Sequence, residues 1–207
     1  MISTKTQVTV AVVFGLSSTF SAAQVPTIAE RVQASGGKPL RILVVQHGSP
    51  VSIADLTAAS DLVVEGKLVR LRSYTSKDAI EVLTDYQIVP SQVFRAQGKD
   101  VATTPGQRPP LVLTMVGGEI SVNGTPVEVV NPTQRPIKNG GHYLLFAKRS
   151  VDGENRYSAT EGSAGIFEVI DGQRVKSLVK RTDDDPEVHD VPFTEIVRRI
   201  QAATARK

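Results

Sequence analysis

The sequence predicts a mainly β fold with flanking helices, in which an antiparallel barrel of five or six strands is closed by a C-terminal helix. From Asp61 onward, apolar and polar residues alternate with the two-residue period of strands. Three dipeptides of the Asn-Gly or Asp-Gly type, at 123–124, 152–153 and 171–172, separate alternating stretches and predict tight hairpin turns. No candidate strand alternates with a helix of crossover length, so the pattern does not favour a parallel α/β sheet.

The composition is that of a folded domain and excludes several kinds of site. The 207 residues include 24 Lys and Arg, 21 Asp and Glu, and no Cys or Trp, with 40% apolar and 22% charged residues. Without Cys there is no disulfide, thiolate metal site, cysteine nucleophile or lipid-anchored cysteine. The formal charge of +3 is too small to indicate a nucleic-acid binder by itself.

Residues 1–23 have the pattern of an export signal. Lys5 lies near the start, an apolar stretch runs from Val8 to Phe20, and the small residues 21–23 predict cleavage before Gln24. The stretch is shorter than a spanning helix and is interrupted by polar residues, so a retained membrane anchor is the weaker alternative. We expect a periplasmic or secreted protein with no membrane span after signal cleavage.

Residues 24–60 are expected to form an N-terminal arm ahead of a barrel and C-terminal helix at 61–207. The arm begins with a short helix at 26–35, because Pro26 suits a first helical position. A strand is predicted at 40–46. A second short helix should start at Ser52, whose hydroxyl can accept a hydrogen bond from a free amide.

The first two barrel strands are expected at 61–74 and 79–94. In the first, the apolar residues change phase beside Gly66, which predicts a β-bulge or a sharp coil. In the second, Pro90 cannot donate a ladder hydrogen bond, so an edge or bend is expected there.

The remaining elements are hairpin strands, an acidic loop and a helix. The expected strands are 111–116, 119–130, 143–151, 156–160, 167–170 and 175–179. The acidic loop covers 183–187, and apolar residues at helical spacing predict a helix from about Phe193. The helix buries its apolar face against the barrel.

Four segments, 53–72, 84–86, 136–146 and 162–169, resemble a family of small exported bacterial proteins of unknown function. The arrangement is similar to the OB-fold barrel of netrin and metalloproteinase-inhibitor (NTR/TIMP-like) domains. The resemblance implies an OB-like barrel. It does not carry over protease inhibition, because those inhibitors chelate the metal through an N-terminal cysteine, whereas this chain has none and is expected to begin at Gln24.

No catalytic residue, metal ligand or cofactor is predicted. His47, His142 and His189 are separated by 95 and 47 residues, without the close pair common in zinc enzymes. A nucleophile elbow has the pattern Gly-x-Ser-x-Gly and leads from a strand into a helix. Around Ser163 the first glycine is replaced by Glu161, and a strand is expected to follow. The acidic loop lacks the glycine and distal glutamate of a calcium-binding EF-hand.

One candidate binding surface can be proposed from the sequence, formed by Lys67, Arg70, Arg72 and Tyr74. Nucleic acid is not the expected ligand, because removal of Lys5 with the signal would leave a charge of +2. The favoured hypothesis is an exported, non-catalytic module that binds a protein or envelope component. Loops 98–110 and 131–141 are expected to carry the contact.

Two alternatives remain. One is a small secreted hydrolase whose site the sequence does not reveal. The other is an oligosaccharide or small-ligand binder, for which an exposed Tyr74 or Tyr157 would be the sign. No feature of the sequence predicts an oligomeric state.

Overall fold

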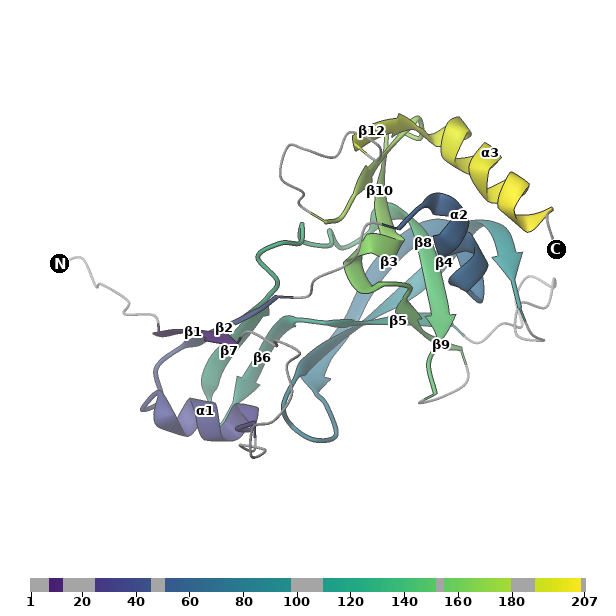
Figure 1. Cartoon of the computed structure of the whole chain (residues 1–207). Helices are drawn as coiled ribbons and strands as arrows, with labels where there is room; N and C mark the ends of the chain where they lie inside the picture. Colours follow the sequence, from purple (N-terminus) through teal and green to yellow (C-terminus); the bar gives the residue numbers. More distant parts are fainter. Residues whose placement is uncertain are drawn as a thin grey trace, which may run out of the picture. The chain divides into compact units, whose positions relative to one another are not determined.

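The computed structural model describes residues 8–12, 25–45, 51–97, 110–151, 155–179 and 189–205 (Figure 1). The described part of the chain is mainly β and contains three α-helices. The chain divides into two compact units. Unit 1 comprises Met1–Val45, Arg72–Thr84 and Val116–Pro132, and unit 2 comprises Gln46–Leu71, Asp85–Met115 and Thr133–Lys207.

Unit 2 contains a closed five-stranded barrel. Its strands are β3 (Leu62–Thr75), β4 (Val82–Ala96), β5 (Leu111–Val116), β8 (Gly141–Arg149) and β9 (Arg156–Ala159). They follow the order β8–β3–β4–β5–β9, and a further β8–β9 pairing closes the ring. The pairing of β5 with β9 is parallel, whereas β8 is antiparallel to both β3 and β9. This is the barrel that the sequence predicts.

The sheet of unit 2 continues beyond the barrel. From β8 it extends to three further strands, β10 (Ile166–Ile170), β11 (Arg174–Ser177) and β12 (His189–Pro192). Two helices, α2 (Ile53–Ala59) and α3 (Phe193–Thr204), pack against each other. The C-terminal helix therefore starts at the residue where helical spacing begins in the sequence.

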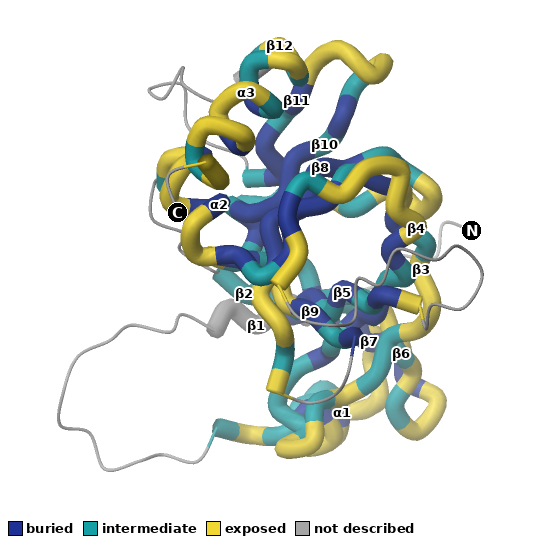
Figure 2. Tube along the Cα trace, turned by 90° about the vertical axis from the view of Figure 1, so that its right-hand side faces the viewer, coloured by how far each residue is buried: buried dark blue, intermediate teal, exposed yellow. Residues whose placement is uncertain are grey.

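Two apolar clusters lie on opposite sides of the barrel wall. Strand side chains form the inner cluster, among them Leu62, Val64, Leu113, Tyr143 and Tyr157. The outer cluster joins β8 and β10 to the helices, with α3 contributing the buried Ile196 and Ile200. Figure 2 shows the buried stretches of β8 and β10 in dark blue. The barrel is thus filled by its own strands, and α3 covers an outer face.

Unit 1 is a four-stranded sheet with one helix. Its elements are β1 (Val8–Val12), α1 (Ile28–Ala34), β2 (Leu40–Val44), β6 (Gly118–Val122) and β7 (Thr125–Val130). The strand order is β1–β2–β7–β6, with β2 parallel to both of its neighbours and β6 antiparallel to β7. Buried side chains of α1 and of the sheet form its core, including Ile28, Val32, Leu40, Ile42 and Val127.

Local signals in the sequence give the observed local structure. Ser52 caps α2 by accepting from the amide of Asp55, as expected. α1 begins at Ile28 after Thr27, which forms a capping box with Glu30, so Pro26 precedes the helix and is not its first residue as expected. The turns at 123–124 and 171–172 join antiparallel strands and have positive φ at both residues. The third dipeptide, at 152–153, lies outside the described residues.

Glycines mark two close backbone approaches in unit 2. A Cβ at Gly66 would overlap the carbonyl oxygen of Val89, so β4 passes β3 at a distance that only glycine allows. The register of β3 with β8 runs without a shift from Leu62 to Leu68, so the β-bulge expected beside Gly66 is absent from this pairing. At Gly165, a Cβ would overlap the carbonyl oxygen of Thr160, which fixes the expected tight bend into β10.

Other features differ from the hairpin pattern or lie outside the described residues. Within the described ranges, the pairings β1–β2, β2–β7 and β5–β9 are parallel. The sheet of unit 1 also takes residues from both sides of the expected boundary between 60 and 61. β1 lies within the predicted signal 1–23, which stays a prediction. His47, loop 98–109 and the acidic loop 183–187 are outside the described residues.

Candidate functional site

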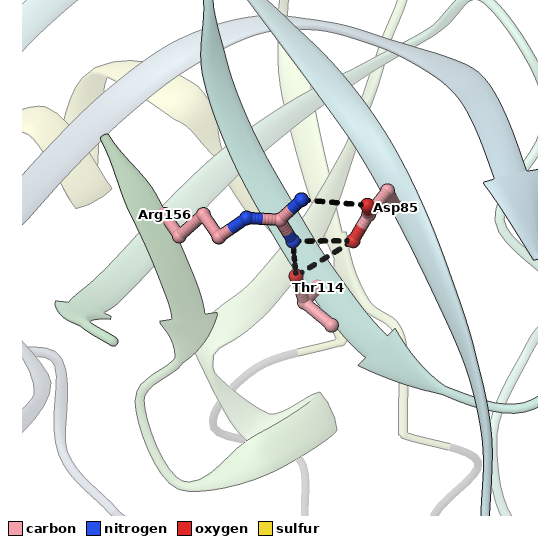
Figure 3. A network of polar contacts seen from close by, with 3 residues as sticks. All are labelled: Asp85, Thr114 and Arg156. Atoms are coloured by element: carbon pink, nitrogen blue, oxygen red, sulfur yellow. Dashed lines mark hydrogen bonds and ion pairs between the residues drawn. The ribbon is translucent and has the colours of Figure 1, made fainter. Parts of the chain in front are cut away.

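A charged network joins three strands of the barrel. Arg156 of β9 donates from Nη1 to Oδ1 of Asp85 at 3.0 Å and from Nη2 to Oδ2 at 3.1 Å. Thr114 of β5 donates to the same Oδ1 at 2.8 Å. Figure 3 shows the three side chains converging from β4, β5 and β9. We call Asp85, Thr114 and Arg156 the clamp.

The clamp has the properties of a structural group. The side chain of Asp85 is only 2% exposed and that of Arg156 is 27% exposed. Both carboxylate oxygens of Asp85 accept from the guanidinium in a bidentate pair, the strongest geometry for these two groups. Because the clamp spans β4, β5 and β9, it supports the part of the ring where β5 pairs with β9 in parallel.

A second polar group lies on β3, β4 and β8. Oγ of Ser91 is 3.2 Å from Nε2 of His142, and Oε1 of Glu65 is 3.4 Å from the same nitrogen. A serine hydrolase needs the acid at Nδ1, so that Nε2 can take the proton of the serine. Here the serine and the acid meet one ring nitrogen, which is not the geometry of a catalytic triad.

Exposed side chains surround this group. Val89 and Val93 of β4 are 45% and 36% exposed, and strand alternation places both on the face of Ser91. Lys67 of β3 is exposed and lies opposite His142 in the β3–β8 register. We call the following set the outer patch: Glu65, Lys67, Val89, Ser91, Val93 and His142.

The four residues of the sequence-derived surface all lie on β3. Strand alternation puts Lys67 on the opposite face from Arg70, so Lys67 belongs with the outer patch. Arg70 is exposed, and its backbone amide donates to Oδ1 of Asn139 at 2.8 Å. In unit 1, the guanidinium of Arg72 covers the ring of the half-buried Tyr74, 4.9 Å from its centroid.

Two tyrosines lie near Arg70 and Lys138 in the barrel unit. Burial raises the pKa of Tyr86, and the charge of Arg70 opposes this shift. Burial also raises the pKa of Tyr143, whose hydroxyl accepts from the amide of Lys138 at 2.8 Å. The side chain of Lys138 pairs with Glu168, which raises the pKa of the lysine. These contacts hold the segment before β8 against the sheet.

The other residues considered from the sequence have structural positions. The hydroxyl of Ser163 donates to Oε1 of Gln134 at 2.7 Å and is buried. Tyr157 is 1% exposed and belongs to the inner cluster. Among the described residues, no three His, Asp or Glu side chains come close enough to hold a metal ion.

Sequence reasoning missed the outer patch and the clamp because their members come from distant strands. Ser91 and His142 are 51 residues apart, and Asp85 and Arg156 are 71 residues apart. One signal was available in the sequence: the charged Asp85 lies within a predicted strand, and a carboxylate that becomes buried there needs a partner. Nothing in the spacing identified Arg156 as that partner.

The comparisons with known proteins give no family. No protein-family model matches the chain, and no curated protein matches it significantly. None of the helices within the described ranges has the length and apolar character needed to cross a bilayer.

Proposed function

We propose that the chain is an exported, non-catalytic binding module that recognises a protein partner in the cell envelope through the outer patch. The export signal predicted at residues 1–23 supports the location. The closed barrel supports a binding role, because it presents its surface residues on strands that are fixed by a filled core.

The exposure of Val89 and Val93 is the observation that carries the proposal. Two large apolar side chains on one face of β4 lose contact with water when a partner covers them. Covering each half-exposed valine would contribute roughly 1 kcal/mol. Between them, Ser91 and His142 offer hydrogen-bonding groups that can orient the partner. Protein–protein interfaces combine apolar contacts with direct hydrogen bonds, and the outer patch offers both.

The charge of the outer patch also favours a protein over a nucleic acid. It holds the carboxylate of Glu65 and the ammonium of Lys67, so its fixed charges nearly cancel. Binding to a phosphate backbone draws on several cations on one surface. A neutral surface with apolar side chains gains little from phosphates and more from an apolar partner.

Site-specific photo-crosslinking in living cells tests this proposal. A photo-reactive amino acid replaces the exposed Lys67 of the outer patch, and a matched control places it at the exposed Gln201 of α3. We expect one discrete protein adduct from position 67 and none of that mass from position 201. The pair Val89→Asp and Val93→Asp should remove the adduct, while Val151→Asp, at a fully exposed valine, should not.

Three outcomes would contradict the proposal. The first is the absence of an adduct at position 67 in cells that produce the folded chain. The second is an adduct of equal intensity in the double valine variant. The third is an adduct that contains glycan but no polypeptide, which would favour the oligosaccharide alternative.

A further inference from the structure

β2 has a neighbour that the exported chain would lose. β1 pairs with β2 in parallel register along its whole length, from Val8 opposite Leu40 to Val12 opposite Val44. β1 lies within residues 1–23, which are proposed to be cleaved off as the export signal. The other side of β2 is paired with β7. Cleavage before Gln24 would therefore leave one full edge of β2 without a partner strand.

The rest of unit 1 holds β2 in place once β1 is gone. Leu40 and Ile42 are 3% and 1% exposed and belong to the core that α1 covers. The β2–β7 pairing runs from Leu40 opposite Val127 to Leu43 opposite Val130. The edge would stay extended, with backbone amides and carbonyls that need hydrogen-bond partners.

The usual protections of an open edge are missing from β2. The strand reads Leu-Arg-Ile-Leu-Val and contains no proline, and Arg41 is its single charge. The side chain of Arg41 reaches Glu128 of β7, with Nε 3.3 Å from Oε2. Its charge is therefore directed toward β7, on the side away from the edge that β1 occupies. Edge strands in other proteins are guarded by charges or prolines.

We propose that β2 of the exported chain is a strand-accepting edge, which binds an extended apolar segment of another polypeptide in parallel orientation. The segment that fits is shown by the chain itself: five residues, Val-Thr-Val-Ala-Val, rich in the β-branched side chains that favour strands. This inference rests on the export part of the proposed function. It adds a contact surface in unit 1 that does not depend on the outer patch.

A peptide-binding experiment tests the proposal. The chain is exported from a bacterial host, purified, and its N-terminus is identified by mass spectrometry. A labelled peptide of sequence Val-Thr-Val-Ala-Val with terminal lysines is then titrated, and its fluorescence anisotropy is measured. Full-length chain made without export is the matched control, because β1 occupies its edge. We expect the exported chain to bind the peptide at least about tenfold more tightly than this control.

N-methylated peptides distinguish strand pairing from simple apolar contact. Successive amides of a strand point to opposite edges, so methyl groups on alternate residues block one edge at a time. One peptide carries them on residues 1, 3 and 5, and the other on residues 2 and 4. We expect one peptide to bind at least about tenfold more weakly and the other to bind within about twofold of the unmodified peptide.

Several results would overturn the proposal. It fails if the exported chain still begins at Met1, if the chain beginning at Gln24 does not bind the peptide, or if both methylated peptides bind equally. The crosslinking at position 67 separates this failure from that of the binding role. A valine-dependent adduct there would keep the outer patch as a partner site while the strand-accepting edge is rejected.

Discussion

The clamp and the outer patch use similar side chains in different surroundings. In the clamp, a carboxylate that is 2% exposed meets a guanidinium through two parallel hydrogen bonds. In the outer patch, the carboxylate of Glu65 is 12% exposed, and the imidazole of His142, 32% exposed, shares one nitrogen between Glu65 and Ser91. Each group joins three strands of the barrel unit, but only the clamp has a bidentate pair, and its carboxylate is the more deeply buried of the two.

The difference teaches that burial, more than the count of polar contacts, decides which group stabilises the fold. A buried charge that loses its partner retains the whole cost of leaving water. A charge at the surface regains water when its partner is removed, so little stability is lost. The clamp should therefore serve stability, and the outer patch is free to serve recognition.

The largest effect is expected from breaking the clamp on one side. Arg156→Met keeps the apolar stem but leaves the carboxylate of Asp85 buried without its cation. We expect the free energy of unfolding to fall by about 3 kcal/mol, the lower end for a buried pair because Arg156 is partly exposed. Urea denaturation at pH 7, followed by circular dichroism, measures this change.

A double variant provides the control for the clamp. Arg156→Met combined with Asp85→Leu removes the orphaned charge together with its partner, and should recover much of the loss. A change within about 0.5 kcal/mol for Arg156→Met alone would contradict the structural role, because it would mean that Asp85 does not depend on the guanidinium.

A much smaller effect is expected in the outer patch. Both Ser91→Ala and His142→Ala remove contacts of one exposed ring nitrogen, so each should change the free energy of unfolding by less than about 0.5 kcal/mol. The same urea series measures both variants. A loss above about 2 kcal/mol in either would make this group structural and would remove it from the proposed partner surface.

The sequence predicts most of what depends on neighbouring residues. Ser52 caps a helix, Asn123 and Asp171 open tight turns, and Phe193 begins the last helix. Each is determined by hydrogen bonds or dihedral angles within a few positions of the residue itself. The predicted barrel of five or six strands agrees with the five strands observed, because local signals of this kind mark where strands end.

The sequence does not predict what depends on strand order. The parallel pairing of β5 with β9 brings Thr114 beside Arg156, and no periodicity announces it. Unit 1 draws on three separate segments of the chain, so no change of composition marks its boundary. The candidate surface on β3 is a different case, because strand alternation alone places Lys67 and Arg70 on opposite faces, so these residues do not form one surface.

The smallest effect is expected from a third polar group, on the surface of α3. Glu195 accepts from Arg198 at 2.8 Å and from Arg199 at 2.9 Å. These hydrogen bonds lower the pKa of Glu195 from 4.5 to about 2. Because the folded pKa lies below the unfolded one, the ionised carboxylate stabilises α3 above pH 4.5, and this contribution disappears as the pH falls toward 2.

Glu195→Gln should remove this pH dependence. The difference in stability between the two proteins should shrink as the pH falls toward 2 and below, because the carboxyl of Glu195 becomes protonated in the folded chain as well. Carboxyl NMR titration measures the pKa of Glu195 directly, and urea series at pH 6 and at low pH compare the two proteins. Titration of Glu195 near 4.5 would show that water screens both arginines. The predicted losses of unfolding free energy would then decrease from the clamp to Glu195 only because the groups are less buried. Hydrogen-bond geometry at exposed sites would contribute nothing.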